Sequence, residues 1–163
     1  MKTHFLLIAA FAIAVTAAAQ TKISGTESCP KPAEMHMLAV GDNPNHSLML
    51  SQAECTWSKP VEIEGLKSKS NHNTSTNDIN GGRTRDQGYV IGTMENGDKF
   101  YVTHQGAGSM KPGAPATYEG KWSFTGGTGK LKGIKGSGTY KGTVSADGGA
   151  VTEVEGEYTV PKK

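Results

Sequence analysis

Residues 124–142 read FTGGTGKLKGIKGSGTYKG, and this run decides the fold. Its glycines and lysines are typical of three structures: a phosphate-binding loop, a flexible linker and a sharply bent piece of β-sheet. A phosphate-binding loop needs Gly, four residues, Gly-Lys and then Ser or Thr, but Leu131 follows Gly129-Lys130 and Phe124 stands where the first glycine should be. The dinucleotide pattern GxGxxG also fails, because lysine occupies its last position in both possible registers. The spacing therefore excludes a phosphate loop.

Strict alternation on both sides of the run predicts β-strands rather than a linker. After Leu131, one face is expected to point inward and consists of Gly136, Gly138, Tyr140, Gly142 and Val144. Three of those five positions lack a side chain, so the strand either coils strongly within a closing barrel or leaves empty volume inside it. Residues 118–125 and 153–160 alternate in the same way, and their inward faces also contain a glycine each.

The remainder of the chain shows further strand patterns and almost no helical periodicity. We expect strands at 22–28, 35–40, 46–57, 61–65, 89–94 and 99–104. Asn96-Gly97 predicts a hairpin between the last two, and the apolar phase of 46–57 changes midway, which predicts a bulge or break. Residues 67–84 are polar and without periodicity, and residues 106–116 contain several glycines and prolines, so both are expected to be loops. Seven or eight short strands indicate an antiparallel barrel or sandwich.

The glycine-rich run resembles the hxGGTGxhxGhxGxGxh segment of the allene oxide cyclase and dirigent-protein superfamily, where h is apolar. The preceding YEGKWSF and the following GTVSADGGAVTEVEGEYTV extend the resemblance over about the C-terminal third of the chain. The resemblance implies an all-β fold, a single antiparallel eight-stranded calycin-like barrel. In that superfamily the segment shapes the barrel and carries no catalysis. The strands that bear the family's pocket residues have no motif to align here.

The resemblance also implies a cofactor-free protein whose barrel cavity holds a small lipophilic or phenolic molecule. Plant members of the superfamily steer a cyclisation or a radical coupling. For this chain the expected partner is therefore a small apolar ligand, and the oligomeric state is left open.

The first 19 residues predict a cleaved signal peptide. Lys2 provides the positive start, residues 5–15 form an apolar run of FLLIAAFAIAV, and three alanines at 17–19 offer a cleavage site. This run is too short to cross a bilayer, which takes roughly 20 apolar residues. We expect a secreted or periplasmic protein in which residues 20–163 form one β-barrel domain.

The two cysteines, Cys29 and Cys55, both lie in the exported part. In an oxidising compartment an isolated pair predicts a disulfide. Nothing resembles the C-x-x-C motif of a redox pair. The bridge is expected to stabilise the fold by roughly 3 kcal/mol on the loop-entropy argument.

Charge and motifs argue against several partners. Without Lys2 the chain has 16 basic and 15 acidic residues, and the basic residues are scattered, so neither nucleic acid nor a membrane surface is an expected partner. Catalytic signatures such as G-x-S-x-G and H-E-x-x-H are absent.

Met35-His36-Met37 contains copper-binding residue types, but a strand places the two methionines on one face and His36 on the other. We expect no metal site there.

The candidate ligand-binding residues are inward-facing aromatic residues and one histidine at the cavity opening: Trp122, Phe124, Tyr140, Tyr158 and His104. Small barrels also fill their interiors with such aromatic side chains, so core packing is the competing interpretation. Three hypotheses follow: a binding protein with a hollow barrel, a cyclase-like or dirigent-like enzyme, and a structural protein of the cell envelope with a solid barrel. A cavity distinguishes the first two from the third, and a buried carboxylate or hydroxyl cluster within it distinguishes the enzyme.

Overall fold

A computed structural model describes residues 20–111 and 113–161 of the protein. The predicted signal peptide, residues 1–19, lies outside this range. The elements in chain order are β1 (Thr21–Cys29), β2 (Glu34–Ala39), β3 (His46–Lys59), β4 (Glu62–Ile63), β5 (Leu66–Asn80), β6 (Arg83–Met94), β7 (Lys99–Ser109), β8 (Ala116–Gly127), the 3₁₀ turn η1 (Gly129–Leu131), β9 (Lys135–Val144) and β10 (Ala150–Thr159).

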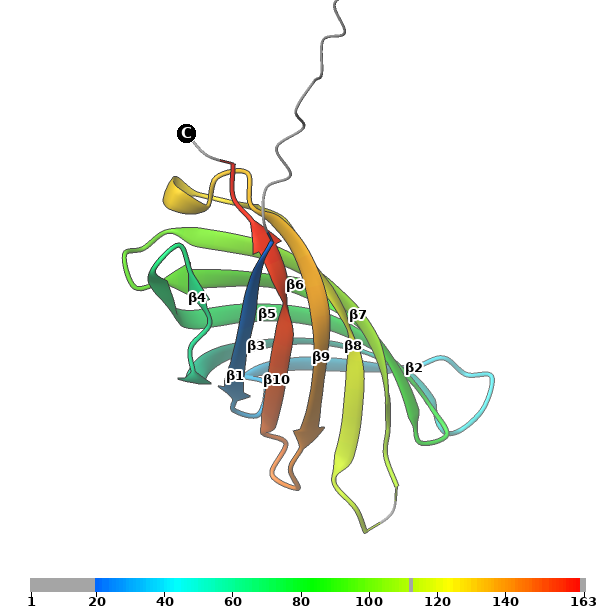
Figure 1. Ribbon diagram of the computed structural model, residues 1–163. Helices are drawn as coiled ribbons and strands as arrows, with labels where there is room; N and C mark the ends of the chain where they lie inside the picture. The colour runs from blue at the N-terminus through cyan, green and yellow to red at the C-terminus, as the bar shows by residue number, and fades with distance from the viewer. Residues whose placement is uncertain (1–19, 112, 162–163) are drawn as a thin grey trace, which may run out of the picture.

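Eight of the strands form a closed antiparallel barrel. They are bonded in the order β3-β1-β10-β9-β8-β7-β6-β5, and β5 pairs back to β3. Figure 1 shows β1, β10, β9 and β8 crossing in front of β3, β5 and β6 at a steep angle. β4 pairs only with β5, and β2 lies outside the ring on the edge of β3. The predicted eight-stranded, all-β barrel is confirmed.

The long strand β3 connects the barrel to β2. Its first half pairs with β2 and its last residues pair with β1, while its other edge pairs with β5 from His46 to Thr56 without interruption. The predicted phase break at 46–57 is therefore wrong: Leu48 and Leu50 are exposed on the outer surface, while Met49 and Ser51 line the interior. Because apolar residues occupy both faces of this strand, the sequence pattern looked as if the inward face changed midway, although it does not. The register irregularity falls later, opposite Thr26 and Glu27 of β1.

The expected loop at 67–84 is the largest error of the sequence analysis. Most of it is β5, which pairs with β3 on one edge and β6 on the other. Its inward face is polar because it lines a cavity, so the hydrophobic alternation that indicates a strand is missing. The loop expected at 106–116 is shorter than predicted, since β7 extends to Ser109 and β8 begins at Ala116. The strand expected at 61–65 shrinks to the two residues of β4.

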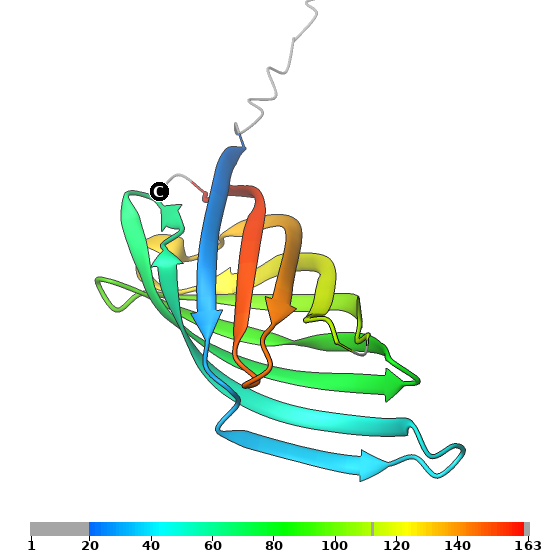
Figure 2. The same cartoon turned by 90° about the horizontal axis from the view of Figure 1, so that it is seen from below.

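The packed core fills one end of the barrel. Side chains from β4, the start of β5, the end of β6, the start of β7 and the segment around η1 are all buried there, among them Ile63, Leu66, Met94, Phe100, Leu131 and Ile134. The opposite end, formed by β2 and the adjoining halves of β3, β5 and β6, spreads outward in Figure 2. The barrel is therefore closed by side chains at one end only.

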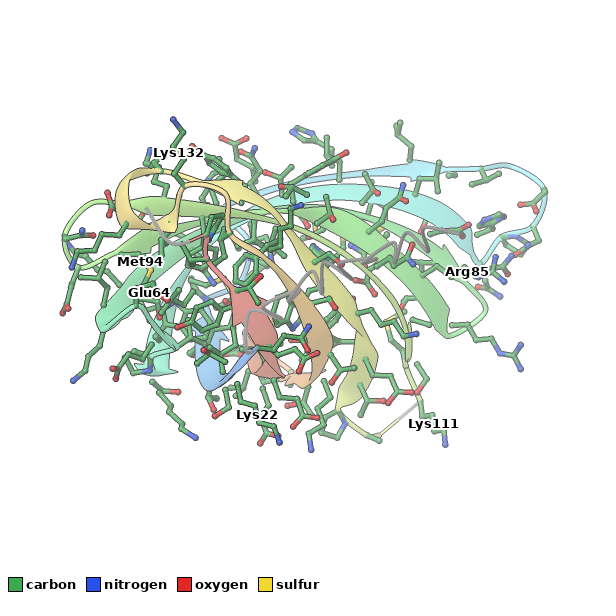
Figure 3. The ribbon with its side chains drawn as sticks, turned by 45° about the horizontal axis from the view of Figure 1, so that its top comes forward. Lys22, Glu64, Arg85, Met94, Lys111 and Lys132 are labelled. Carbon is green, nitrogen blue, oxygen red and sulfur yellow. A yellow bond between two sulfur atoms is a disulfide. The ribbon has the colours of Figure 1, made fainter. Side chains whose placement is uncertain are left out.

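The lysines of the glycine-rich run lie on the surface. Lys130, Lys132 and Lys135 are exposed, and Figure 3 shows Lys132, like Lys22, Arg85 and Lys111, pointing away from the barrel. None of the described helices has the length and hydropathy needed to cross a membrane.

The predicted disulfide is present. Cys29, the last residue of β1, bonds Cys55 of β3 across 26 positions of sequence. It links the neighbouring barrel strands β1 and β3, and it is consistent with an oxidising compartment.

Candidate functional site

The barrel encloses a cavity of about 490 Å³. Its wall receives side chains from all eight barrel strands. The end nearest the packed core is apolar, with Ile23, Val61, Phe100, Val102 and Trp122. Farther out the wall becomes polar on β5, β6 and β7. A volume of this size is ordinary for a small-molecule site, so the barrel is hollow rather than solid.

Two inward glycines of the run, Gly138 and Gly142, are covered by aromatic rings from a neighbouring strand. The ring of Trp122 on β8 lies over Gly138 of β9 and Gly156 of β10, with Cζ2 2.6 and 2.5 Å from where their Cβ atoms would be. Tyr118 covers Gly142 in the same way. The glycines therefore make room for rings lying flat against the wall, which is how large aromatic side chains and a hollow interior coexist.

A second row of glycines lets Tyr140 reach across the barrel wall. Asp86, Gly106, Gly120 and Tyr140 are successive cross-strand partners on β6, β7, β8 and β9. The Tyr140 hydroxyl occupies the space that side chains at both glycines would need. It thereby donates a 2.6 Å hydrogen bond to Asp86 Oδ2, three strands away.

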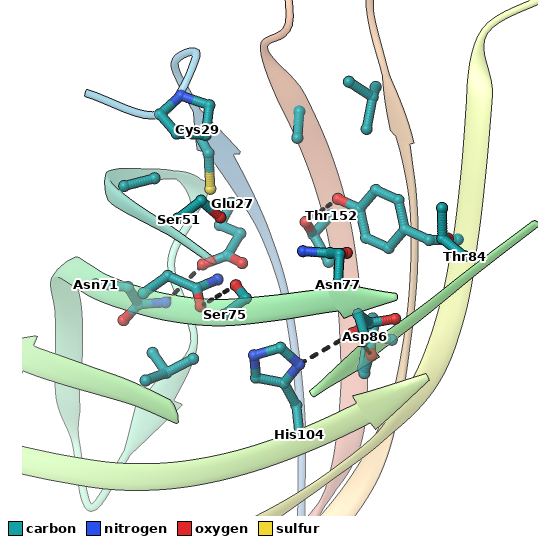
Figure 4. A pocket seen from close by; sticks show the side chains of 18 of the residues that line it. Glu27, Cys29, Ser51, Asn71, Ser75, Asn77, Thr84, Asp86, His104 and Thr152 are labelled. Atoms are coloured by element: carbon teal, nitrogen blue, oxygen red, sulfur yellow. Dashed lines mark hydrogen bonds and ion pairs between the residues drawn. The ribbon is translucent and has the colours of Figure 1, made fainter. Parts of the chain in front are cut away.

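His104 of β7 completes a buried polar cluster with Asp86 and Tyr140. Its Nδ1 lies 3.2 Å from Asp86 Oδ2, and the two side chains are only 11% and 13% exposed. The imidazole packs edge-on against the Tyr140 ring, with centroids 5.8 Å apart, and lies over Gly88. Figure 4 shows His104 and Asp86 meeting at the cavity wall.

The cluster holds Asp86 as a carboxylate. Burial alone would raise the pKa of Asp86, but the hydrogen bonds from His104 and Tyr140 outweigh it, and the pKa lies below its ordinary value. Burial and the hydrogen bond to the Asp86 carboxylate raise the pKa of Tyr140 strongly, so its phenol keeps its proton.

A second buried carboxyl, Glu27 of β1, lies on another part of the wall. It is 7% exposed and accepts a 2.6 Å hydrogen bond from Asn71 Nδ2 of β5. Burial raises the pKa of Glu27, and the hydrogen bond from Asn71 offsets only part of that effect. The cavity thus holds two carboxyl groups whose surroundings move their pKa values in opposite directions.

Four polar atoms of the wall are buried and have no hydrogen-bond partner within the described residues. They are Asp86 Oδ1, His104 Nε2, Asn71 Oδ1 and the indole Nε1 of Trp57. Two of them, the carboxylate and amide oxygens, are obligate acceptors. A buried acceptor left unpaired costs about 1–3 kcal/mol. The wall is therefore arranged to receive hydrogen-bond donors from a guest molecule or from water.

The polar side of the wall comes mainly from β5, whose inward face is Asn71, Asn73, Ser75 and Asn77. Sequence reasoning missed this strand because neither face is apolar. A signal was present, since NHNTSTND at 71–78 alternates amides or serine with histidine, threonines and aspartate. Such polar alternation predicts a strand lining a wet cavity.

Four of the five predicted residues line the cavity: Trp122, Phe124, Tyr140 and His104. Tyr158 does not contribute to that wall. It is buried in the packed core, where its hydroxyl accepts a hydrogen bond from the backbone N–H of Glu64. His104 lies within the wall rather than at the opening, and Asp86 is the partner that the sequence did not reveal.

The predicted faces around Met35-His36-Met37 are confirmed. Met35 and Met37 line the cavity mouth, while His36 is paired with Leu50 on the outer face. Among the described residues, the one cluster of metal-ligand types is Glu27 with Cys29 and Cys55. Both sulfurs are committed to the disulfide, so this cluster offers no thiolate.

Comparison with known proteins supports the barrel. Searches against protein-family models and against curated proteins gave no match. Among solved structures, the pterocarpan synthase dirigent protein PsPTS1 superposes with a TM-score of 0.52 at 12% identity, covering 89% of this chain and 97% of that one. The pterocarpan synthase dirigent protein GePTS1 gives 0.53 at 14% identity, covering 99% and 100%. The barrel is dirigent-like. At such identities the likeness concerns the fold, and the resemblance of the glycine segment to allene oxide cyclases remains a sequence-based prediction.

Proposed function

We propose that this dirigent-like barrel binds a small molecule with an apolar, ring-containing body and at least one hydroxyl donor. The apolar end of the cavity would hold the body, and the acceptors on the polar wall would receive the hydroxyl groups. The observation that carries the proposal is the pair of unpartnered buried acceptors, Asp86 Oδ1 and Asn71 Oδ1, beside an apolar cavity. A phenolic compound has this chemistry. The disulfide and the N-terminal sequence support placing the protein outside the cytoplasm.

Tryptophan fluorescence tests the proposal directly, because both tryptophans of the chain, Trp57 and Trp122, line the cavity. The probes are 2-naphthol and 2-methoxynaphthalene, which have the same ring system but differ in that only the first can donate a hydrogen bond. We expect saturable quenching by 2-naphthol and at least a tenfold weaker affinity for the methoxy compound, because one buried hydrogen bond to a charged acceptor is worth about 1.5–3 kcal/mol. Equal affinities would contradict the role of the acceptors, and no saturation with either probe would contradict ligand binding.

The second candidate function is cofactor-free acid–base catalysis on the bound molecule. It is favoured by the two buried carboxyl groups. The raised pKa of Glu27 suits it to donate a proton, and the lowered pKa of Asp86 keeps it ionised, so that it can act as the base. Asp86 Oδ1 is the atom available to take a proton, since Oδ2 is held by His104 and Tyr140.

A substrate-independent assay tests this candidate. The elimination of 5-nitrobenzisoxazole needs only a positioned carboxylate in an apolar cavity. We expect turnover above the rate of acetate buffer, abolished in Asp86→Asn and retained in Glu27→Gln. No acceleration by the wild-type protein, or equal acceleration by Asp86→Asn, would contradict catalysis by Asp86.

A further inference from the structure

The edge strand β2 is the least covered element of the protein. All six of its residues are exposed, and within residues 20–111 and 113–161 it pairs with β3 alone. Its other edge therefore presents unpaired backbone N–H and C=O groups. Figure 2 shows β2 as the outermost strand of the spreading end of the barrel.

Exposed apolar side chains gather around this edge. Of the ten large hydrophobic residues exposed in the described part of the chain, six lie on β2, directly after it, or on the part of β3 that pairs with it: Met35, Met37, Leu38, Val40, Leu48 and Leu50. Leu38 is the most exposed, at 73%, and is the cross-strand partner of Leu48. Exposed apolar side chains are individually common, but a contiguous group marks an interaction surface.

The edge also lacks the features that protect free strands. Natural edge strands carry lysine, proline or a bulge, or are covered by a loop. β2 reads EMHMLA and pairs with β3 in unbroken register, so it has none of the first three. A regular edge strand with three exposed apolar side chains, Met35, Met37 and Leu38, is suited to pairing with another strand.

We propose that two copies of the chain pair through β2, antiparallel and related by a two-fold axis, to form one continuous sheet. A second copy fits because β2 carries exposed apolar side chains on both faces, Leu38 on one and Met35 and Met37 on the other, and therefore needs a partner strand with apolar side chains on both faces, as β2 itself has. The six exposed apolar residues of β2, β3 and Val40 offer on the order of 500 Å², and with the backbone edge added this approaches the roughly 800 Å² per partner of a stable interface. The symmetric contact is self-limiting, since it leaves no free β2 edge.

The pairing also completes the cavity mouth. Met35 and Met37 line the cavity, yet they are 43% and 57% exposed because the wall ends at β2. In the dimer the partner's β2 continues the wall past these two methionines. Each copy would thus shield the open side of the other's cavity, and methionine suits such a contact because its flexible thioether adapts to its surroundings.

The mass in solution tests the proposal, measured by sedimentation or light scattering at micromolar concentration. We expect twice the chain mass for the wild-type protein and the single-chain mass for Met37→Lys, because two-fold symmetry brings like charges together at the new edge. The matched control is Tyr89→Lys, which places the same charge at an exposed apolar residue of β6 away from the edge, and should leave the dimer intact. A monomeric wild-type protein, or a dimer that survives Met37→Lys, would overturn the proposal.

Cross-linking identifies the edge itself. The described chain has no free cysteine, so one introduced residue is the sole thiol. In an antiparallel two-fold pair one residue lies on the axis and faces itself, so at least one of Met35→Cys, His36→Cys, Met37→Cys and Leu38→Cys should form a disulfide-linked dimer on mild oxidation. A dimer in which none of the four cross-links faster than Tyr89→Cys would show that the copies meet elsewhere. Both measurements are independent of ligand binding, so they stand or fall separately from the proposed function.

Discussion

The two halves of the cavity wall are built on different chemistry. β8, β9 and β10 form a dry wall, in which aromatic rings lie over glycines: Trp122 over Gly138 and Gly156, and Tyr118 over Gly142. β5 and β6 form a wet wall of amides, serine and a carboxylate, with Asn71, Ser75 and Asp86 labelled in Figure 4. The dry wall is held by close packing of rings against glycines, whereas the wet wall contains polar atoms without hydrogen-bond partners among the described residues. We infer that the dry wall determines the barrel structure and that the wet wall determines which molecules the cavity binds.

The largest expected effect comes from filling a glycine of the dry wall. In Gly138→Val the new side chain would overlap the carbonyl oxygen of Glu155 and the ring of Trp122. The barrel cannot move both, so we expect a loss of about 3 kcal/mol or more in the free energy of unfolding, measured by urea denaturation. The matched control is Gly126→Ala in β8, where the added carbon meets only Tyr101, 3.6 Å away. An unchanged unfolding midpoint for Gly138→Val would show that the ring-over-glycine packing does not hold the barrel.

The same contrast explains what the sequence could predict. Alternating aromatic residues and glycines, as in YEGKWSF and GSGTYKG, indicate strands directly, so the dry wall and the barrel class were predictable. β5 was not, because a strand facing a wet cavity has no apolar face to distinguish it from a loop. Asp86 and His104 lie 18 residues apart and Tyr140 54 beyond Asp86, and only strand register brings them together. A local sequence pattern does not show how distant strands pair, so the sequence did not predict this cluster.

A smaller effect is expected where Tyr140 joins the two walls. Tyr140→Phe keeps the ring against Gly120 but removes the hydrogen bond to the Asp86 carboxylate. Because the acceptor is charged, the loss should be about 1.5–3 kcal/mol in urea unfolding. Tyr118→Phe is the comparison within the dry wall: it removes a hydrogen bond to the Thr152 hydroxyl, a neutral partner, and should cost about 1 kcal/mol. If the two losses were equal, the Asp86 cluster would be no stronger than an ordinary hydroxyl pair.

The pH dependence of stability distinguishes the two carboxyl groups. The folded protein binds the Glu27 proton more tightly than the unfolded chain does, so Glu27 makes the free energy of unfolding fall as the pH rises from 4.5 through its folded pKa. Asp86 acts in the opposite direction: its contribution is present above 3.8 and is lost as the pH falls through its lowered pKa.

Urea unfolding across this range should therefore show Glu27→Gln gaining relative to the wild-type protein as the pH rises, by about 1.4 kcal/mol for each unit by which the Glu27 pKa is raised. Glu119→Gln, on the exposed outer face of β8, is the control and should run parallel to the wild-type curve. A wild-type and a Glu27→Gln curve that run parallel would mean that Glu27 is solvated in the folded protein.

The smallest expected effect comes from placing an apolar residue in the wet wall, and it is compared with placing a polar residue in the dry wall. Asn77 of β5 and Val154 of β10 both line the cavity. Asn77→Val should change the free energy of unfolding by no more than about 0.5 kcal/mol, because it removes no hydrogen bond found in the described structure and valine favours strands. Val154→Asn, by contrast, places an unpaired amide against the packed core and should cost about 1–3 kcal/mol. A large loss for Asn77→Val would mean that the wet wall also holds the barrel together, and the division between a structural and a chemical wall would fail.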